Sequence, residues 1–114
     1  MRPIAWHANT DFTIAAFREW LLWQPVGSIV GLVAVASRCP LSCWITEMSG
    51  KSCVVGISSY RCPAWYEERP LPEWAWQFAL LLDHTYLTDA HLRVALGRPV
   101  KREQALEVLE QVGQ

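Results

Sequence analysis

Residues 72–86 read Pro-Glu-Trp-Ala-Trp-Gln-Phe-Ala-Leu-Leu-Leu-Asp-His-Thr-Tyr, and this stretch decides the fold class. A proline at the first position and a glutamate in the first turn are typical of a helix N-terminus. At about 100° per residue, six apolar side chains fall on one broad stripe. They are Trp74, Ala75, Phe78, Leu81, Leu82 and Tyr86. The stretch therefore predicts a long helix that packs on a core.

A second apolar line follows the other side of this helix. Trp76 and Leu80 lie one turn apart, and Leu87 follows two turns later, among polar residues. One interpretation is that the loop 61–71 or the first helix folds across this line and buries it. The alternative is an apolar patch with a polar rim, which marks a protein interface anchored by the tryptophan. The residue pattern leaves both interpretations open.

Four more helices are expected around this central one. The first is capped by Asn9 or Thr10, ends at about Trp23, and is apolar over more than half its circumference, which predicts burial on two sides. The others are a helix opened by Pro40 and closed by Gly50, a short helix over 88–96, and a last helix over 101–112.

Two further segments predict a small β element. Residues 28–36 form an apolar, β-branched run that fits a buried strand better than a helix, although both readings are possible. Residues 51–60 predict a strand broken at Gly56, and 61–72 an ordered loop or an edge hairpin. The expected fold is a single compact α+β domain over residues 1–114, mainly α, with about five helices and a sheet built from 28–36 and 52–59.

Composition excludes several classes of protein. The 114 residues are 52% hydrophobic and 18% charged, which is incompatible with disorder. A net charge of -1 argues against a nucleic-acid binder that works by bulk positive charge. No apolar run is long enough to span a membrane, and no export signal is readable, so we expect a cytoplasmic protein with reduced cysteines.

The four cysteines raise the question of a metal site or a reactive thiol. Cys39, Cys43, Cys53 and Cys62 could surround zinc, but only the first pair has the close spacing of zinc knuckles. We therefore expect no metal, no cofactor and buried free cysteines. At a helix start beside Arg38, the Cys39 thiol would have a lowered pKa, yet no positioned base is evident for a thiol enzyme.

The loop before the central helix is the second candidate for partner binding. Trp65, Tyr66 and Arg69 interleave aromatic and basic groups, as single-strand nucleic-acid binders do. Glu67 and Glu68 cancel that charge, so a protein contact is favoured over nucleic acid.

These observations predict a non-enzymatic, tryptophan-rich protein-binding module. Its partner is another protein or a second copy, reached through Trp76, Leu80 and Leu87 and the loop residues. Size and composition are typical of a small inhibitor, adaptor or subunit, such as those that phage and other mobile elements encode. The alternative is a zinc-stabilised or nucleic-acid-contacting module that uses the four cysteines and the loop 60–69.

Overall fold

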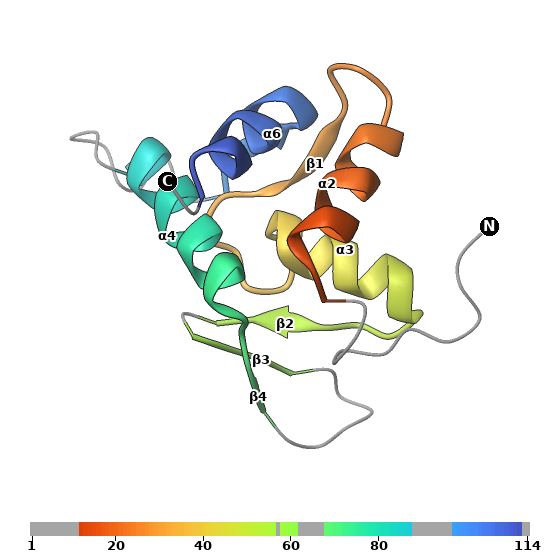
Figure 1. Ribbon diagram of the computed structural model, residues 1–114, viewed down its shortest axis with the longest axis vertical. Coiled ribbons are helices and arrows are strands. Elements are labelled where there is room, and N and C mark those ends of the chain that lie inside the picture. Colours follow the sequence, from red (N-terminus) through yellow and green to blue (C-terminus); the bar gives the residue numbers. More distant parts are fainter. Residues whose placement is uncertain (1–11, 57, 62–67, 88–96, 113–114) are drawn as a thin grey trace.

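The computed structural model describes residues 12–56, 58–61, 68–87 and 97–112, and these form an α+β arrangement (Figure 1). Within these ranges lie four α-helices rather than about five, and the predicted helix 88–96 lies outside the described residues. Roughly half of the described chain is helical, so the prediction of a mainly α fold was too strong. The helices are α2 (Ile14–Trp23), α3 (Pro40–Ser49), α4 (Glu73–Leu87) and α6 (Arg102–Glu110).

Local chemistry sets the ends of these helices. Thr13 caps α2, because its hydroxyl accepts a hydrogen bond from the Ala16 N–H at 3.1 Å; the predicted caps lie outside the described residues. Pro40 opens α3 and Gly50 closes it with φ 74°, which confirms both predicted ends. The last helix spans 102–110 and not 101–112, because Lys101 belongs to a strand and Gln111 is the C-cap.

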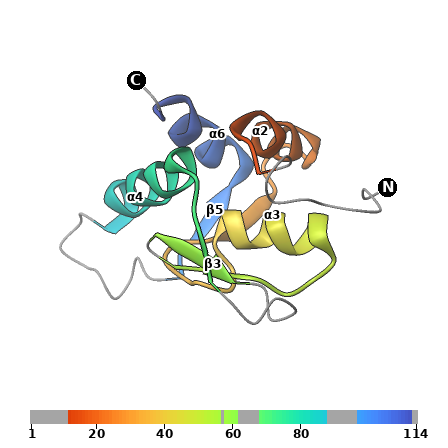
Figure 2. The same ribbon diagram turned by 60° about the horizontal axis from the view of Figure 1, so that its bottom comes forward.

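The strands form two separate antiparallel sheets. β1 (Ile29–Leu32) pairs with β5 (Pro99–Lys101). The second sheet has the order β2-β3-β4, and its strands are β2 (Val54–Val55), β3 (Ser59–Arg61) and β4 (Arg69–Pro70). In Figure 2, as in Figure 1, this second sheet lies at the opposite end of the molecule from α2 and α6.

The predicted single sheet of 28–36 and 52–59 was therefore wrong. β1 ends at Leu32, and Ala34 turns the chain with φ 57°. Among the described residues, the two segments are joined by a hydrogen bond from the Val55 N–H to the Ala36 carbonyl and do not pair as strands. The broken strand expected over 51–60 is a hairpin, in which the Gly56 N–H bonds to the Ser59 carbonyl at 2.7 Å. The pairing partner of β1 is instead β5, which lies far along the chain.

An aromatic cluster fills the core between the helices. Phe17 of α2 is fully buried. The centroid of its ring lies 5.1 Å from the ring centroid of Trp44 in α3 and 5.1 Å from that of Phe78 in α4. Trp74 joins the cluster, with its ring 5.7 Å from Phe17. α6 packs on α2 and α4 and closes the core from the other side (Figure 1). No helix in the described part of the chain is long and apolar enough to cross a membrane.

Candidate functional site

The exposed apolar side chains concentrate at the corner between α2 and β1. Within the described residues, five large hydrophobic side chains are strongly exposed, and four of them fall between positions 22 and 29. These four, which we call the ridge, are Leu22 at 54%, Trp23 at 63%, Val26 at 79% and Ile29 at 53% exposure. Their backbone forms the end of α2, the turn and the start of β1 (Figure 1). The predicted burial of α2 on two sides was wrong at this end of the helix.

The start of α6 holds the backbone of the ridge in place. The Arg102 guanidinium donates from Nη1 to the Leu22 and Gln24 carbonyls at 3.3 Å each, and so caps the last carbonyls of α2. The Glu103 carboxylate accepts from the Gly27 N–H at 2.9 Å. Arg102 and Glu103 also form a salt bridge with each other, in which Nε and Oε2 lie 2.8 Å apart. The ridge is thus a backbone-fixed turn whose apolar side chains point away from their own core.

The Glu103 carboxyl that holds the turn has a lowered pKa. The hydrogen bond from Arg102 is the main reason that the pKa of the Glu103 carboxyl lies below its ordinary value, with the Gly27 N–H acting in the same direction. A lowered pKa means that the folded chain favours the carboxylate. The contribution of Glu103 to stability is therefore present above the unfolded-state pKa and is lost as the pH falls through the folded-state pKa.

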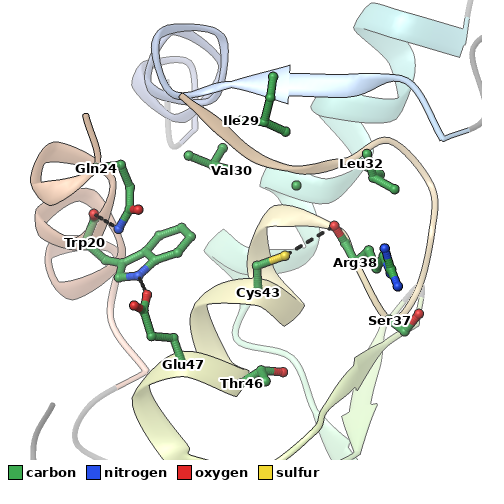
Figure 3. A pocket seen from close by; sticks show the side chains of 11 residues that line it. Trp20, Gln24, Ile29, Val30, Leu32, Ser37, Arg38, Cys43, Thr46 and Glu47 are labelled. Carbon is green, nitrogen blue, oxygen red and sulfur yellow. Dashed lines mark hydrogen bonds between the residues drawn. The ribbon is translucent and has the colours of Figure 1, made fainter. Parts of the chain in front are cut away.

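A pocket of about 600 Å³ adjoins the ridge, between α2, β1 and α3 (Figure 3). Its volume is in the range of ligand and side-chain pockets. Eleven residues line it: Trp20, Gln24, Ile29, Val30, Gly31, Leu32, Ser37, Arg38, Cys43, Thr46 and Glu47. The segment 22–29, which carries the ridge, also contributes Gln24 and Ile29 to this lining. The pocket and the ridge therefore share one edge.

Gly31 brings the two walls of the pocket together. A Cβ at this position would lie 2.5 Å from the Pro40 nitrogen and 2.8 Å from the Cys39 carbonyl carbon, which are backbone atoms at the start of α3. The neighbouring Leu32 N–H donates to the Arg38 carbonyl at 2.7 Å. Only glycine permits this approach, and it fixes the distance between β1 and α3.

Several polar groups of the pocket are bonded within the chain. The Trp20 indole N–H donates to the Glu47 carboxylate, and the Gln24 amide donates to the Trp20 carbonyl at 3.0 Å. The Cys43 thiol, near the middle of the pocket in Figure 3, donates to the Arg38 carbonyl at 3.4 Å. The remaining surface is largely apolar and comes from Trp20 and the residues of β1. This arrangement suits an apolar side chain better than a charged ligand.

The reactive thiol considered from the sequence is not favoured by its surroundings. Cys39 lies at the start of α3, as expected, in the N-cap position and without a side-chain cap hydrogen bond. Burial raises the pKa of its thiol, and hydrogen bonds from Ser42 and Leu41 only partly oppose this. Burial also raises the pKa of Cys43. The expected lowering of the Cys39 pKa was therefore wrong, because desolvation outweighs the helix terminus.

The remaining cysteines bear on the zinc alternative. Cys53 is disulfide-bonded, whereas Cys39 and Cys43 are free. The expectation that all four thiols are reduced was thus wrong at Cys53, and the cysteines no longer support a cytoplasmic location. Cys62 lies outside the described residues. Across the described ranges, no three His, Cys, Asp or Glu side chains gather as metal ligands would.

The structure describes the side chains of three of the six partner-binding residues predicted from the sequence, namely Trp76, Leu80 and Arg69. Trp76 is partly buried against the core, while Leu80, in the next turn of α4, is 48% exposed. The described part of the structure does not include Trp65, Tyr66 or the side chain of Leu87. Arg69 lies in β4 and pairs with Tyr60 of β3.

Sequence reasoning missed the ridge. A usable signal was present, because residues 22–29 carry no charge and include a Pro-Val-Gly turn between two apolar segments. Comparison of the chain with protein-family models, with curated proteins and with solved structures finds no match. Any functional conclusion therefore depends on the geometry of the chain itself.

Proposed function

We propose that this chain is a non-enzymatic protein-binding module whose contact surface is the ridge and the adjoining pocket. The observation that carries the proposal is the ridge itself, an apolar turn that α6 fixes through Arg102 and Glu103 while its side chains stay exposed. Exposed apolar side chains that gather in one segment of the chain are typical of protein interfaces, and a tryptophan is a frequent anchor. A fixed backbone also lowers the ordering entropy that binding costs.

The energetics require the pocket as well as the ridge. Burying the exposed fractions of the four ridge side chains contributes roughly 6–9 kcal/mol of gross hydrophobic free energy. Association costs at least about 4 kcal/mol of this, and micromolar affinity needs about 8 kcal/mol net. The ridge alone therefore supports weak binding. The walls of the pocket supply the additional apolar contact.

Native mass spectrometry of the chain isolated from its own cells tests this proposal. We expect the wild-type chain to carry a second protein mass, and a Trp23→Ser, Val26→Ser variant to lose it. Leu80→Ser is the matched control, because it also removes an exposed apolar side chain but lies on α4. If the Leu80 variant loses the partner and the ridge variant keeps it, the α4 surface predicted from the sequence is the binding site and this proposal is wrong.

A further inference from the structure

We infer that the disulfide of Cys53 joins it to Cys62, and that this bond closes the hairpin of β2 and β3. The chain contains four cysteines, of which Cys39 and Cys43 are free thiols, whereas Cys53 is disulfide-bonded. The structure is that of a single chain, so the second sulfur belongs to the same chain. Cys62, which lies outside the described residues, is the one partner that remains.

The pairing of β2 with β3 supports this assignment. The two strands are antiparallel and lie side by side, and Val54 pairs with Arg61 (Figure 1). In an antiparallel pair, each step back along one strand corresponds to one step forward along the other. The register therefore pairs Cys53 with the residue after Arg61, which is Cys62.

Backbone hydrogen bonds place Cys53 at the kind of position where cross-strand disulfides form. The Val55 N–H donates away from β3, to the Ala36 carbonyl at 2.9 Å, and the Cys53 N–H also points away, to the Thr46 hydroxyl at 3.1 Å. Cys53 and Val55 thus occupy non-hydrogen-bonded positions, at which facing Cα atoms lie about 4.5 Å apart. That distance falls within the range of about 4.4–6.8 Å that a disulfide spans.

A cross-link at this point compensates for the small size of the second sheet. β2 has two residues, β3 three and β4 two, and strands this short form few hydrogen bonds with one another. The sheet nevertheless places Val55 and Tyr60 in the core, where they are 5% and 3% exposed. A disulfide that closes the loop 53–62 lowers the entropy of the unfolded chain, and so favours the hairpin.

Formation of this bond requires an oxidant. The two thiols lose two protons and two electrons, and a disulfide of another molecule accepts them by exchange and is reduced to two thiols. Proteins usually acquire stable disulfides in oxidising compartments, because glutathione and thioredoxin keep cytosolic thiols reduced. We therefore expect the chain to fold in an oxidising compartment rather than in the cytoplasm. Cys39 and Cys43 stay reduced there, because burial raises the pKa of both thiols and only a thiolate attacks a disulfide.

A peptide map without reduction tests the pairing. The cells that make this chain are lysed in guanidinium chloride with iodoacetamide, which alkylates every free thiol, and the chain is digested with trypsin. Trypsin separates the cysteines into the peptides 39–51, 52–61 and one that begins at Cys62. We expect the second peptide to be disulfide-linked to the third, and the first to carry two labels.

Two other results of this map overturn the inference, each at a different point. A link between the peptides 52–61 and 39–51 overturns the assignment of the partner. An alkylated Cys53 in the chain from its own cells overturns the oxidising compartment, even where the purified chain forms the bond in air.

Thermal unfolding tests the role of the bond. Cys62→Ser lowers the melting temperature by about 10 °C, which is the shift expected from a loop of this length in a domain of this size. Cys43→Ser is the matched control, because it replaces a free thiol, and it shifts the melting temperature by less than about 3 °C. If Cys62→Ser fails to fold, the wild-type chain refolded in dithiothreitol gives the same comparison. A shift no larger than that of the control overturns the stabilising role.

Discussion

Gly31→Ala is the most direct test of how β1 meets α3. The added Cβ would lie 2.5, 2.8 and 2.9 Å from the Pro40 nitrogen, the Cys39 carbonyl carbon and the Arg38 carbonyl oxygen. All three are backbone atoms, so no side-chain rotation relieves the overlap. Either β1 or the start of α3 must move, and the hydrogen bond from the Leu32 N–H to the Arg38 carbonyl lengthens with it.

The cost follows from the kind of strain. Overpacking at a well-packed site destabilises by about 1–3 kcal/mol, and a weakened hydrogen bond adds about 1 kcal/mol. We therefore expect the free energy of unfolding to fall by about 2–4 kcal/mol. For a domain of this size the melting temperature falls by roughly 8–15 °C.

Gly56→Ala is the matched control for Gly31→Ala. Its Cβ would lie 3.4 Å from the Ser59 carbonyl oxygen, which is an ordinary contact. We therefore expect the free energy of unfolding to change by less than about 1 kcal/mol. Urea unfolding followed by tryptophan fluorescence measures both variants, with an unchanged m-value as the check that only stability changed. If Gly31→Ala lowers the free energy of unfolding by less than about 0.5 kcal/mol, the close approach of β1 to α3 is not a constraint on this fold.

Three further results are expected. Arg102→Ala removes the donors to the end of α2, so it costs roughly 1 kcal/mol, and amide hydrogen exchange over residues 22–28 becomes faster; unchanged exchange would show that α6 does not hold the ridge. Burial raises the pKa of the Cys39 and Cys43 thiols, so at pH 7.5 both react with iodoacetamide more slowly than glutathione does. Mass spectrometry of the labelled chain reads the two sites separately, and faster labelling of either contradicts its burial. Burial also raises the pKa of Asp83, so its charge opposes folding as the pH rises through the folded-state pKa. Asp83→Asn is therefore more stable than wild type at pH 7 by a few tenths of a kcal/mol, and the difference disappears near pH 3; equal stability at both pH values excludes this cost.

Helices were the most predictable part of this fold. Pro40 and Gly50 act on the backbone directly, through a fixed φ and a left-handed turn, so the ends of α3 follow from residue type alone. α4 was equally readable, because its long apolar stripe repeats at the helical period. Both signals are local, and local signals need no knowledge of the rest of the chain.

Strand pairing could not be predicted in the same way. β5 is three residues long, begins with Pro99 and pairs with Ile29–Leu32, about seventy positions earlier. Nothing in such a short segment specifies its partner, because the pairing depends on where α4 and α6 bring the chain back. The two sheets were for that reason merged into one in the sequence-based prediction.

The ridge was missed because periodicity records which residues are apolar and not what covers them. On a helical wheel Trp23 falls beside Trp20, which is buried, whereas Leu22 falls between Arg18 and Glu19 on the polar side. The different burial of Trp20 and Trp23 arises from tertiary structure, because Trp20 faces α3, where its indole N–H donates to Glu47, and Trp23 is the last residue of the helix. The charge-free turn that follows was the remaining signal.

Stability does not account for the composition of this corner. Arg102 and Glu103 hold the turn through the Leu22 and Gln24 carbonyls and the Gly27 N–H, so polar side chains at positions 23 and 26 would leave all of these bonds intact. Side chains that are 63% and 79% exposed bury little of their own surface, and exposed substitutions usually change stability by less than about 0.5 kcal/mol. The fold therefore requires the backbone of the ridge but not its tryptophan or valine. Because exposed apolar groups also favour unwanted association, their presence in the turn is the physical ground for the binding role that we propose.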